Sequence, residues 1–360
     1  MSNSNHQLLI YRCIIGLLLI GLTLEVQGQD PQFSQFYASP VNLNPALTGG
    51  FAAKYRVSAL YRDQWRGPLE QSIGVFGAAL DLRFDLKSRA LEGDAAAAGL
   101  HFLSDQVGPL DLSTNTIALA GAFHKSLDLE NSKYLSAGIQ LATTQRNILY
   151  ENLFFQDQFD GVDQFNGATA EDLPENNFSF GDFAIGLNYA STPTNGTAIY
   201  VGGTVHHIIE PEVSFYRNDD DEQQQILSSS KLFRRYGFHG GITTDLNDNV
   251  KISPRLYFVN QGPHRSLSIG NNFIIEPSRT DAFKLHLGTW LQLAQDFDDS
   301  VTPDAIGFLA GLGIGDLLVG LSYDINLRDI INYRTGQGAF EFSISYFGIY
   351  EEEGGACPTF

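Results

Sequence analysis

Most of the chain from residue 53 onward alternates apolar side chains with small or polar ones. A clear case is residues 316–326, where Leu317, Val319, Leu321, Tyr323 and Ile325 alternate with Gly320, Ser322, Asp324 and Asn326. A repeat of two residues is typical of a β-strand with one apolar and one polar face. About fourteen such segments, each of roughly 10 to 15 residues, are separated by turn residues. They span 53–66, 70–84, 94–105, 113–126, 133–146, 178–191, 197–209, 231–245, 249–261, 264–276, 282–295, 304–313, 316–326 and 338–350.

The two faces of these segments favour a membrane protein over a soluble one. Strands of this length can cross a bilayer at a tilt. Their polar positions are mostly Gly, Ser, Thr, Asn, Gln and His, whereas the exposed face of a soluble sandwich usually carries many Lys and Glu. The sequence therefore predicts an all-β fold, a transmembrane antiparallel β-barrel of about 14 strands over residues 52–350. A soluble secreted adhesin remains an alternative, since it would show the same period.

The lengths of the connections between strands sort into two groups. With the amino end of the first strand in the periplasm, nearly all periplasmic connections are short, and the long insertions 147–177, 210–230 and 327–337 lie outside. Short periplasmic turns and longer outside loops are typical of outer-membrane barrels. The short connections 67–69 and 262–263 weaken this pattern.

Several side chains at predicted strand ends, and one proline, bear on the regularity of the barrel. Aromatic residues near strand ends could form girdles at the two membrane interfaces or fill a β-core. They are Tyr55, Trp65, Tyr189, Tyr257, Tyr346 and Tyr350. Pro254 lies inside an otherwise regular strand, and a closed barrel has no edge to hold it, so we expect a bulge there. In residues 95–98, four alanines specify the strand register only weakly.

The amino-terminal residues 1–28 predict a cleaved signal peptide. Arg12 precedes an apolar run over 13–24, and Val26-Gln27-Gly28 offers a cleavage site before Gln29. The run is short for a spanning helix, which needs about 20 residues, so a retained anchor is the less favoured alternative. The mean hydropathy of -0.10 is too polar for a bundle of membrane helices.

The next segment, residues 29–51, is rich in proline and asparagine. Each proline removes a backbone donor and disfavours helix in the residue before it. We therefore expect an irregular strap or plug on the periplasmic side. The first predicted strand follows, and we expect its polar face to meet water. This face carries Lys54, Arg56, Ser58 and Arg62.

Composition limits the chemistry that this chain can perform. The net charge of -19, from 41 acidic and 22 basic residues, disfavours nucleic acid as a partner. Removal of Cys13 with the leader would leave only Cys357, so no intrachain disulfide is expected. Asp157, Asp160 and Asp163 could attract calcium, but the EF-hand order of ligands is absent and a solvated loop is favoured. No sequence motif assigns a catalytic residue, a cofactor or a metal, so we expect no enzymatic activity.

Five histidines fall on the predicted inward face: His101, His124, His206, His239 and His286. A metal site would need several of them at one height in the barrel. Nothing in the sequence sets their relative depths, so we interpret them as polar lumen residues.

Two motifs at the start of the mature chain carry a family resemblance. The run QFSQFYASPVNLNPALTG at residues 32–49, followed by YRDQW at 61–65, resembles the opening of the PorP/SprF family. These are outer-membrane proteins of the type IX secretion system, which exports proteins and gliding adhesins. The acidic and aromatic loop after the fifth predicted strand and the Cys-Pro at 357–358 also resemble this family. The resemblance implies a non-enzymatic part in secretion, either in the core machinery or as the dedicated partner of one surface adhesin.

This resemblance also implies partners on both sides of the membrane. Other secretion components would bind at the periplasmic face, a large secreted adhesin is a candidate partner at the outer face, and lipid would surround the barrel. The segment 29–51 and the tail 351–360 would form the periplasmic docking face, although a frayed terminus is the plainer interpretation of the tail. Candidate contact residues are Phe33, Phe36, Tyr37, Asn42, Pro45, Trp65, Cys357 and Phe360.

A hydrophobic-solute channel is the main alternative function. Fourteen strands with an amino-terminal plug also look like the fatty-acid transporter architecture, and a fold does not settle a function. A continuous apolar lumen would favour the channel. A lumen blocked by packed side chains would favour a scaffold.

Overall fold

A computed structural model describes residues 30–348 of the chain, apart from short gaps. The gaps are 68, 70, 87–92, 163, 166, 194–195, 216–229, 278–282, 296–299 and 329–337. The predicted signal peptide and the predicted tail, with Tyr350, Cys357 and Phe360, lie outside the described residues. Residues from Pro31 onward form one compact unit.

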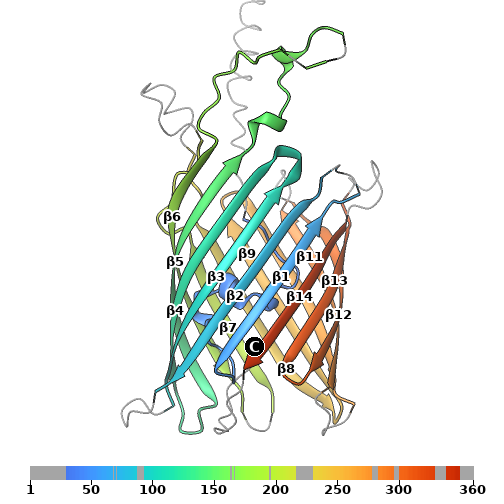
Figure 1. The fold of residues 1–360 in the computed structure, drawn as a ribbon. Helices are drawn as coiled ribbons and strands as arrows, with labels where there is room; N and C mark the ends of the chain where they lie inside the picture. Colours follow the sequence, from blue (N-terminus) through green and yellow to red (C-terminus); the bar gives the residue numbers. More distant parts are fainter. Residues whose placement is uncertain are drawn as a thin grey trace, which may run out of the picture. The chain divides into compact units, whose positions relative to one another are not determined.

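Fourteen antiparallel strands form a closed barrel in which each strand pairs with its neighbours in sequence and β1 pairs with β14 (Figure 1). Each predicted segment coincides with one strand, because alternation and turn residues were enough to define all of them. The strands are β1 (Tyr55–Gln64), β2 (Ile73–Asp85), β3 (Ala95–Val107), β4 (Leu112–Ser126), β5 (Lys133–Ile148), β6 (Asn177–Ser191), β7 (Ala198–His206), β8 (Arg235–Asn247), β9 (Val250–Gln261), β10 (His264–Ile275), β11 (Phe283–Gln295), β12 (Val301–Ile314), β13 (Leu317–Asn326) and β14 (Gly338–Gly348).

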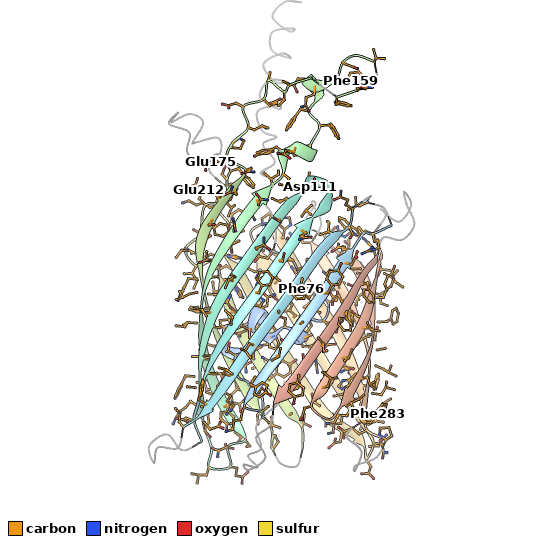
Figure 2. All side chains as sticks on the ribbon, viewed as in Figure 1. Phe76, Asp111, Phe159, Glu175, Glu212 and Phe283 are labelled. Carbon is orange, nitrogen blue, oxygen red and sulfur yellow. The ribbon has the colours of Figure 1, made fainter. Side chains whose placement is uncertain are left out.

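The barrel wall has an apolar outer face and a polar inner face, as the alternation predicted. Side chains with large exposed fractions on the outside include Val57, Leu119, Leu141, Leu187 and Phe308. Figure 2 shows such side chains, Phe76 and Phe283 among them, projecting from the wall. The inward positions between them are largely buried, and they include His101, His124, His206 and His239.

The prediction of a bulge at Pro254 was wrong, because the strand register does not shift at this residue. The β8–β9 register is the same on both sides of Pro254, with Gly241 opposite Arg255 and Thr244 opposite Ile252. A proline removes only one ladder donor, and this strand absorbs the loss without an extra residue. A bulge does accompany a different proline, because β11 and β12 shift register at Gln292/Leu293, opposite Pro303.

The connections differ between the two rims. One rim, here the long-loop rim, carries the connections 149–176, 207–234 and 327–337, whereas the longest connection at the short-turn rim is 86–94. Tyr55 pairs with Gly348, so the barrel begins and ends at the short-turn rim. Because the number of strands is even, the end of the plug and the end of β14 lie at the same rim.

The segment Pro31–Ala53, here the plug, lies inside the barrel (Figure 1). Its only regular elements are the turns η1 (Phe36–Ala38), α2 (Pro40–Leu43) and η2 (Pro45–Leu47). Two prolines stand at the first positions of α2 and η2, where a missing backbone donor costs nothing. Among the described residues, no helix is long and apolar enough to cross a membrane.

Candidate functional site

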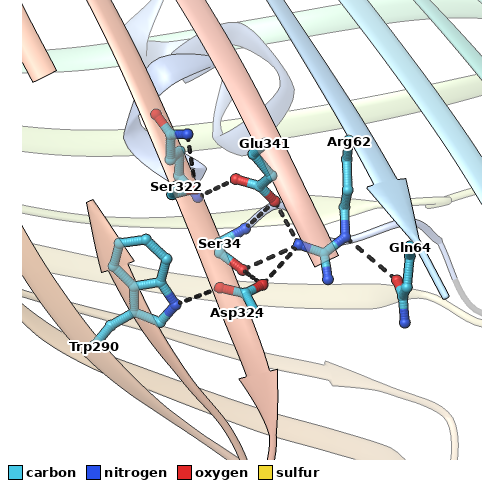
Figure 3. Close-up of polar contacts among 8 residues, drawn as sticks. Ser34, Arg62, Gln64, Trp290, Ser322, Asp324 and Glu341 are labelled. Carbon is cyan, nitrogen blue, oxygen red and sulfur yellow. Dashed lines mark hydrogen bonds and ion pairs between the residues drawn. The ribbon is translucent and has the colours of Figure 1, made fainter. Parts of the chain in front are cut away.

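The start of the plug is bound by a buried charge cluster on β1, β13 and β14 (Figure 3). Arg62 Nη1 lies 2.9 Å from Asp324 Oδ2 and 2.5 Å from Glu341 Oε1, and it donates to Ser34 Oγ at 3.1 Å. Ser34 Oγ donates to Asp324, whose other oxygen accepts from Trp290 Nε1 at 3.1 Å. One guanidinium therefore joins two wall carboxylates to a plug side chain.

The plug backbone completes this cluster. The amides of Ser34 and Gln35 donate to the two oxygens of Glu341, each at 2.8 Å. The Gln35 side chain donates to Ser322 at 2.9 Å and accepts from Ser343 at 2.7 Å. Because all of these groups are buried, an unmatched carboxylate here would be costly, and the hydrogen bonds of the plug remove that cost.

Two glycines of the wall, Gly138 and Gly186, leave space for the middle of the plug, and this pair is called here the glycine seat. A Cβ atom at Gly138 would lie 2.3 Å from the Pro45 carbonyl carbon, and one at Gly186 would lie 1.8 Å from Asn44 Oδ1. Asn44 Nδ2 donates to the carbonyls of Leu187 and Gly203, at 3.1 and 3.2 Å. The backbone of η2 therefore approaches β5 and β6 at a distance that only glycine allows.

The end of the plug binds β2 and β4 through its backbone. His124 Nε2 donates to the Thr48 carbonyl at 2.8 Å, and Arg83 Nη1 donates to the Gly49 carbonyl at 3.0 Å. The Gly49 amide donates to Asp81, which also pairs with Arg56. Since Arg56 and Arg62 are buried under the plug, the expectation that this face of the first strand meets water was wrong.

An aromatic contact fixes η1 against β9. The ring centroids of Phe36 and Tyr257 are 5.2 Å apart, and the Arg255 guanidinium lies 4.2 Å from the centroid of Tyr37. Tyr257 is therefore a buried lumen residue, so of the two alternatives for this side chain the structure supports core packing and not an interface girdle. The period of two in β9 leaves both faces apolar at this height, with Leu256 and Phe258 on the outside.

The candidate contact residues are placed as follows. The side chains of Phe33, Phe36 and Pro45 are buried against the wall, those of Tyr37, Asn42 and Trp65 are half-buried, and Cys357 and Phe360 lie outside the described residues. In this conformation the buried three contact the barrel itself. Whether any of the set binds another secretion component stays a prediction.

Within the connection 149–176, a small hairpin stands above the long-loop rim (Figure 2). It is called here the outer hairpin and comprises the described residues of 154–170, that is, without 163 and 166. Phe159 and Phe165 form an isolated bridge, and the Asp160 amide donates to the Gln164 carbonyl at 2.8 Å. The ring of Phe165 lies 5.1 Å from that of Phe159 and 5.8 Å from that of Phe154. The exposed fractions of Phe154 and Val162 are 73% and 81%, so the hairpin presents apolar side chains to water.

All charged side chains in the connection that contains the outer hairpin are acidic. The connection 149–176 contains no lysine or arginine, and its acidic residues are Glu151, Asp157, Asp160, Asp163, Glu171, Asp172 and Glu175. Asp160 caps the local turn, with its Oδ1 accepting from the amides of Val162 and Gln164 at 2.9 and 3.2 Å. Because Asp157 and Asp160 serve separate turns, their arrangement does not favour a shared calcium ion. Among the described residues, no group of three or more potential ligands could hold a metal.

Asp157 closes the base of the outer hairpin, and this predicts a pH dependence. Its Oδ2 accepts from the Ala170 amide at 2.5 Å, and this bond, aided by the Thr169 hydroxyl, lowers the pKa of Asp157 from 3.8. A lowered pKa stabilises the hairpin above the unfolded value, and this contribution is lost as the pH falls through the folded pKa. In an NMR pH titration, we expect the chemical shift of the Ala170 amide to change with a midpoint at a pH below 3.8. The same resonance should not titrate in Asp157→Asn, and a midpoint at or above the usual value would contradict this contact.

A closed barrel with an apolar outer face and a lumen occupied by its own amino-terminal segment defines an integral outer-membrane β-barrel protein. The chain belongs to the family of type IX secretion system membrane proteins PorP/SprF, whose model matches residues 25–346. This family and the barrel fold point to a non-enzymatic structural or transport role in the outer membrane, and the family implies contacts with other type IX components. A comparison with curated proteins finds no significant match.

Solved barrel structures are similar only at low sequence identity. A mutant of the monoaromatic hydrocarbon channel TodX is 10% identical, covers 87% of this chain and 94% of its own, and has a TM-score of 0.49. A Pseudomonas aeruginosa FadL homologue is 12% identical over 86% and 94% of the two chains, with a TM-score of 0.46. The NanC porin is 10% identical over 82% and 100%, with a TM-score of 0.36.

Proposed function

We propose that this protein is a plugged scaffold of the type IX secretion system that retains an exported surface protein at its long-loop rim. The observation that carries this proposal is the plug. Its beginning, middle and end bind different parts of the wall, so the lumen serves to hold the chain's own segment. We place the short-turn rim in the periplasm, as is usual for outer-membrane barrels, so that the outer hairpin faces the cell surface.

The outer hairpin supplies a surface for such a partner. Aromatic side chains dominate the energetics of many protein interfaces, and here they stand among carboxylates with no neighbouring basic residue in the connection. The complementary partner is an exported polypeptide with a basic and apolar surface. A second copy of this chain does not fit this description, because each copy carries a net charge of -19.

The channel alternative meets an obstacle in the lumen. A hydrophobic solute would need an apolar path, whereas the inner wall carries Arg62, Asp324 and Glu341 at the start of the plug. Moving a solute past them would require the plug to leave its buried hydrogen bonds. Tight binding of a fatty acid to the purified protein would nevertheless favour the channel.

The test of the proposed function is deletion of the gene, followed by a survey of surface and secreted proteins. Loss of one adhesin would support a dedicated partner, and loss of all type IX cargo would support a core role. Restoring the gene with Phe154→Ser and Phe165→Ser should leave surface retention of that protein at least tenfold lower, since truncation of aromatic anchors costs about 2 kcal/mol or more each. The matched control is Leu129→Ser, a fully exposed apolar residue at the short-turn rim. Normal export and retention in the deletion strain would refute the proposal.

A further inference from the structure

A hollow of about 400 Å³, here the outer notch, lies on the outward face of the barrel wall where β1, β2 and β3 reach the long-loop rim. Tyr61 and Phe76 are among its lining residues, and both project outward from the wall. Arg66, Gln71 and Gln106 contribute its polar lining. The notch is separate from the lumen and from the outer hairpin.

The notch stands at the upper boundary of the apolar surface. On β2, the outward positions from Phe76 to Phe84 are all apolar, and the next outward position toward the rim is Gly74. On β3, the outward positions change from Leu100 and Phe102 to Ser104 and Gln106. Such a boundary is the level at which lipid acyl chains meet their headgroups.

A missing side chain creates the space. A Cβ atom added at Gly74 would meet no atom closer than the Tyr61 hydroxyl, at 4.0 Å. No neighbouring atom is close enough to exclude a side chain at Gly74. Because this position has no side chain, a hollow with a polar lining remains directly above the apolar surface that begins at Phe76.

A buried carboxylate holds the cation of the notch. Asp63 faces outward but is only 7% exposed, and it accepts from Arg66 Nε at 2.8 Å and from the Tyr61 hydroxyl at 3.3 Å. A second Arg66 nitrogen also binds this carboxylate. Asp63 Oδ1 is buried and has no hydrogen-bond partner among the described residues. The guanidinium is thus oriented at the edge of the notch, with further N–H groups left to donate.

We propose that the outer notch binds the phosphate of an outer-leaflet lipid headgroup, with the acyl chains lying on Phe76 and the apolar surface below it. The proposal takes its choice of leaflet from the orientation in the proposed function. An oriented guanidinium is well suited to phosphate because it donates two parallel hydrogen bonds. The amides of Gln71 and Gln106 can donate to a headgroup or accept from its ammonium or hydroxyl groups. Asp63 acts as a positioning residue, which binds Arg66 rather than the lipid.

The test measures lipid retention by the purified full-length protein in detergent, using native mass spectrometry. The probes are phosphatidylethanolamine, lipid A and a phosphate-free galactolipid. We expect one retained copy of a phosphate lipid, and the preference between the first two probes identifies its source. Arg66→Gln removes the cation, and Gly74→Val fills the notch where a Cβ has room. Arg66→Gln should lower retention about tenfold, because it removes a charge-assisted hydrogen bond to the phosphate. Gly74→Val should also lower retention, because its side chain occupies the space that the headgroup would fill.

The matched control is Arg265→Gln, which removes an exposed arginine at the same rim, where β10 begins. It should retain lipid as the wild type does. Heat-modifiable gel migration should show that every variant is a folded barrel. Equal retention by Arg66→Gln and wild type, or equal binding of the galactolipid, would overturn the proposal. This assay involves no export, so a negative result for lipid binding would leave the scaffold proposal intact. Conversely, an export experiment that refuted the scaffold proposal would not refute phosphate binding in vitro.

Discussion

Replacing Arg62 with alanine is expected to destabilise the plugged barrel by about 3 to 5 kcal/mol, because the change leaves two buried carboxylates without their cation. Asp324 and Glu341 are both almost fully buried, so water cannot replace the guanidinium without entering the wall. The start of the plug should leave this cluster first, since Glu341 binds its backbone. Limited proteolysis should then cut the plug, and thermal unfolding in detergent should begin at a lower temperature.

The control for this prediction restores charge balance without restoring the arginine. The triple variant Arg62→Met, Asp324→Asn and Glu341→Gln keeps similar volumes and removes all three charges, which is often neutral for a buried ion cluster. It should recover much of the lost stability. Arg265→Ala, at an exposed position, should leave both proteolysis and unfolding unchanged. A protease-resistant plug in Arg62→Ala would mean that the cluster does not hold it.

The strand count and the inner and outer faces could be predicted from the sequence because both depend on local order. Alternation fixes a face, and glycine or polar clusters fix a turn, so no long-range information is needed. The inward orientation of the histidines could be predicted from the same alternation, here called the parity of a strand position. The apolar outer face followed from it as well, and with it the membrane assignment.

The plug contacts could not be predicted, because they join residues that are far apart in sequence. Arg62 and Asp324 are 262 positions apart, and Arg62 and Glu341 are 279 apart. Parity placed all three on the inner face, but nothing local set their heights. The signal that could have found this cluster was the charge itself. Acidic and basic residues at inward positions of strands need partners when the lumen is filled.

The glycine seat was missed for a related reason. Gly138 and Gly186 read as ordinary small residues on a polar face, and only the packed structure shows that Pro45 and Asn44 occupy the space beside them. The motif at residues 32–49 was predicted to contact partners, and that stays a prediction. Much of the motif contacts the wall of the barrel, and this contact was not predicted.

Replacing Gly138 with valine is expected to expel the plug while leaving the barrel closed. A Cβ at this position would lie 2.3 Å and 2.4 Å from backbone atoms of Pro45 and Ala46, so the plug must move because no side chain can yield. Valine itself favours strands, and the pairs of β5 with β4 and β6 are unchanged. An emptied barrel of fourteen strands lies in size between small filled barrels and aqueous porins.

Planar-bilayer recordings should therefore show several-fold higher conductance for Gly138→Val than for the wild type, and proteolysis should cut the released plug. Gly181→Val is the matched control, since this glycine of β6 is exposed on the outer face and a Cβ there has no neighbour closer than 3.9 Å. Unchanged conductance with a cleavable plug would mean that other segments seal the lumen. A wild-type protein that already conducts as the variant does would contradict the scaffold proposal, because a plug that does not seal leaves the barrel free to act as a channel.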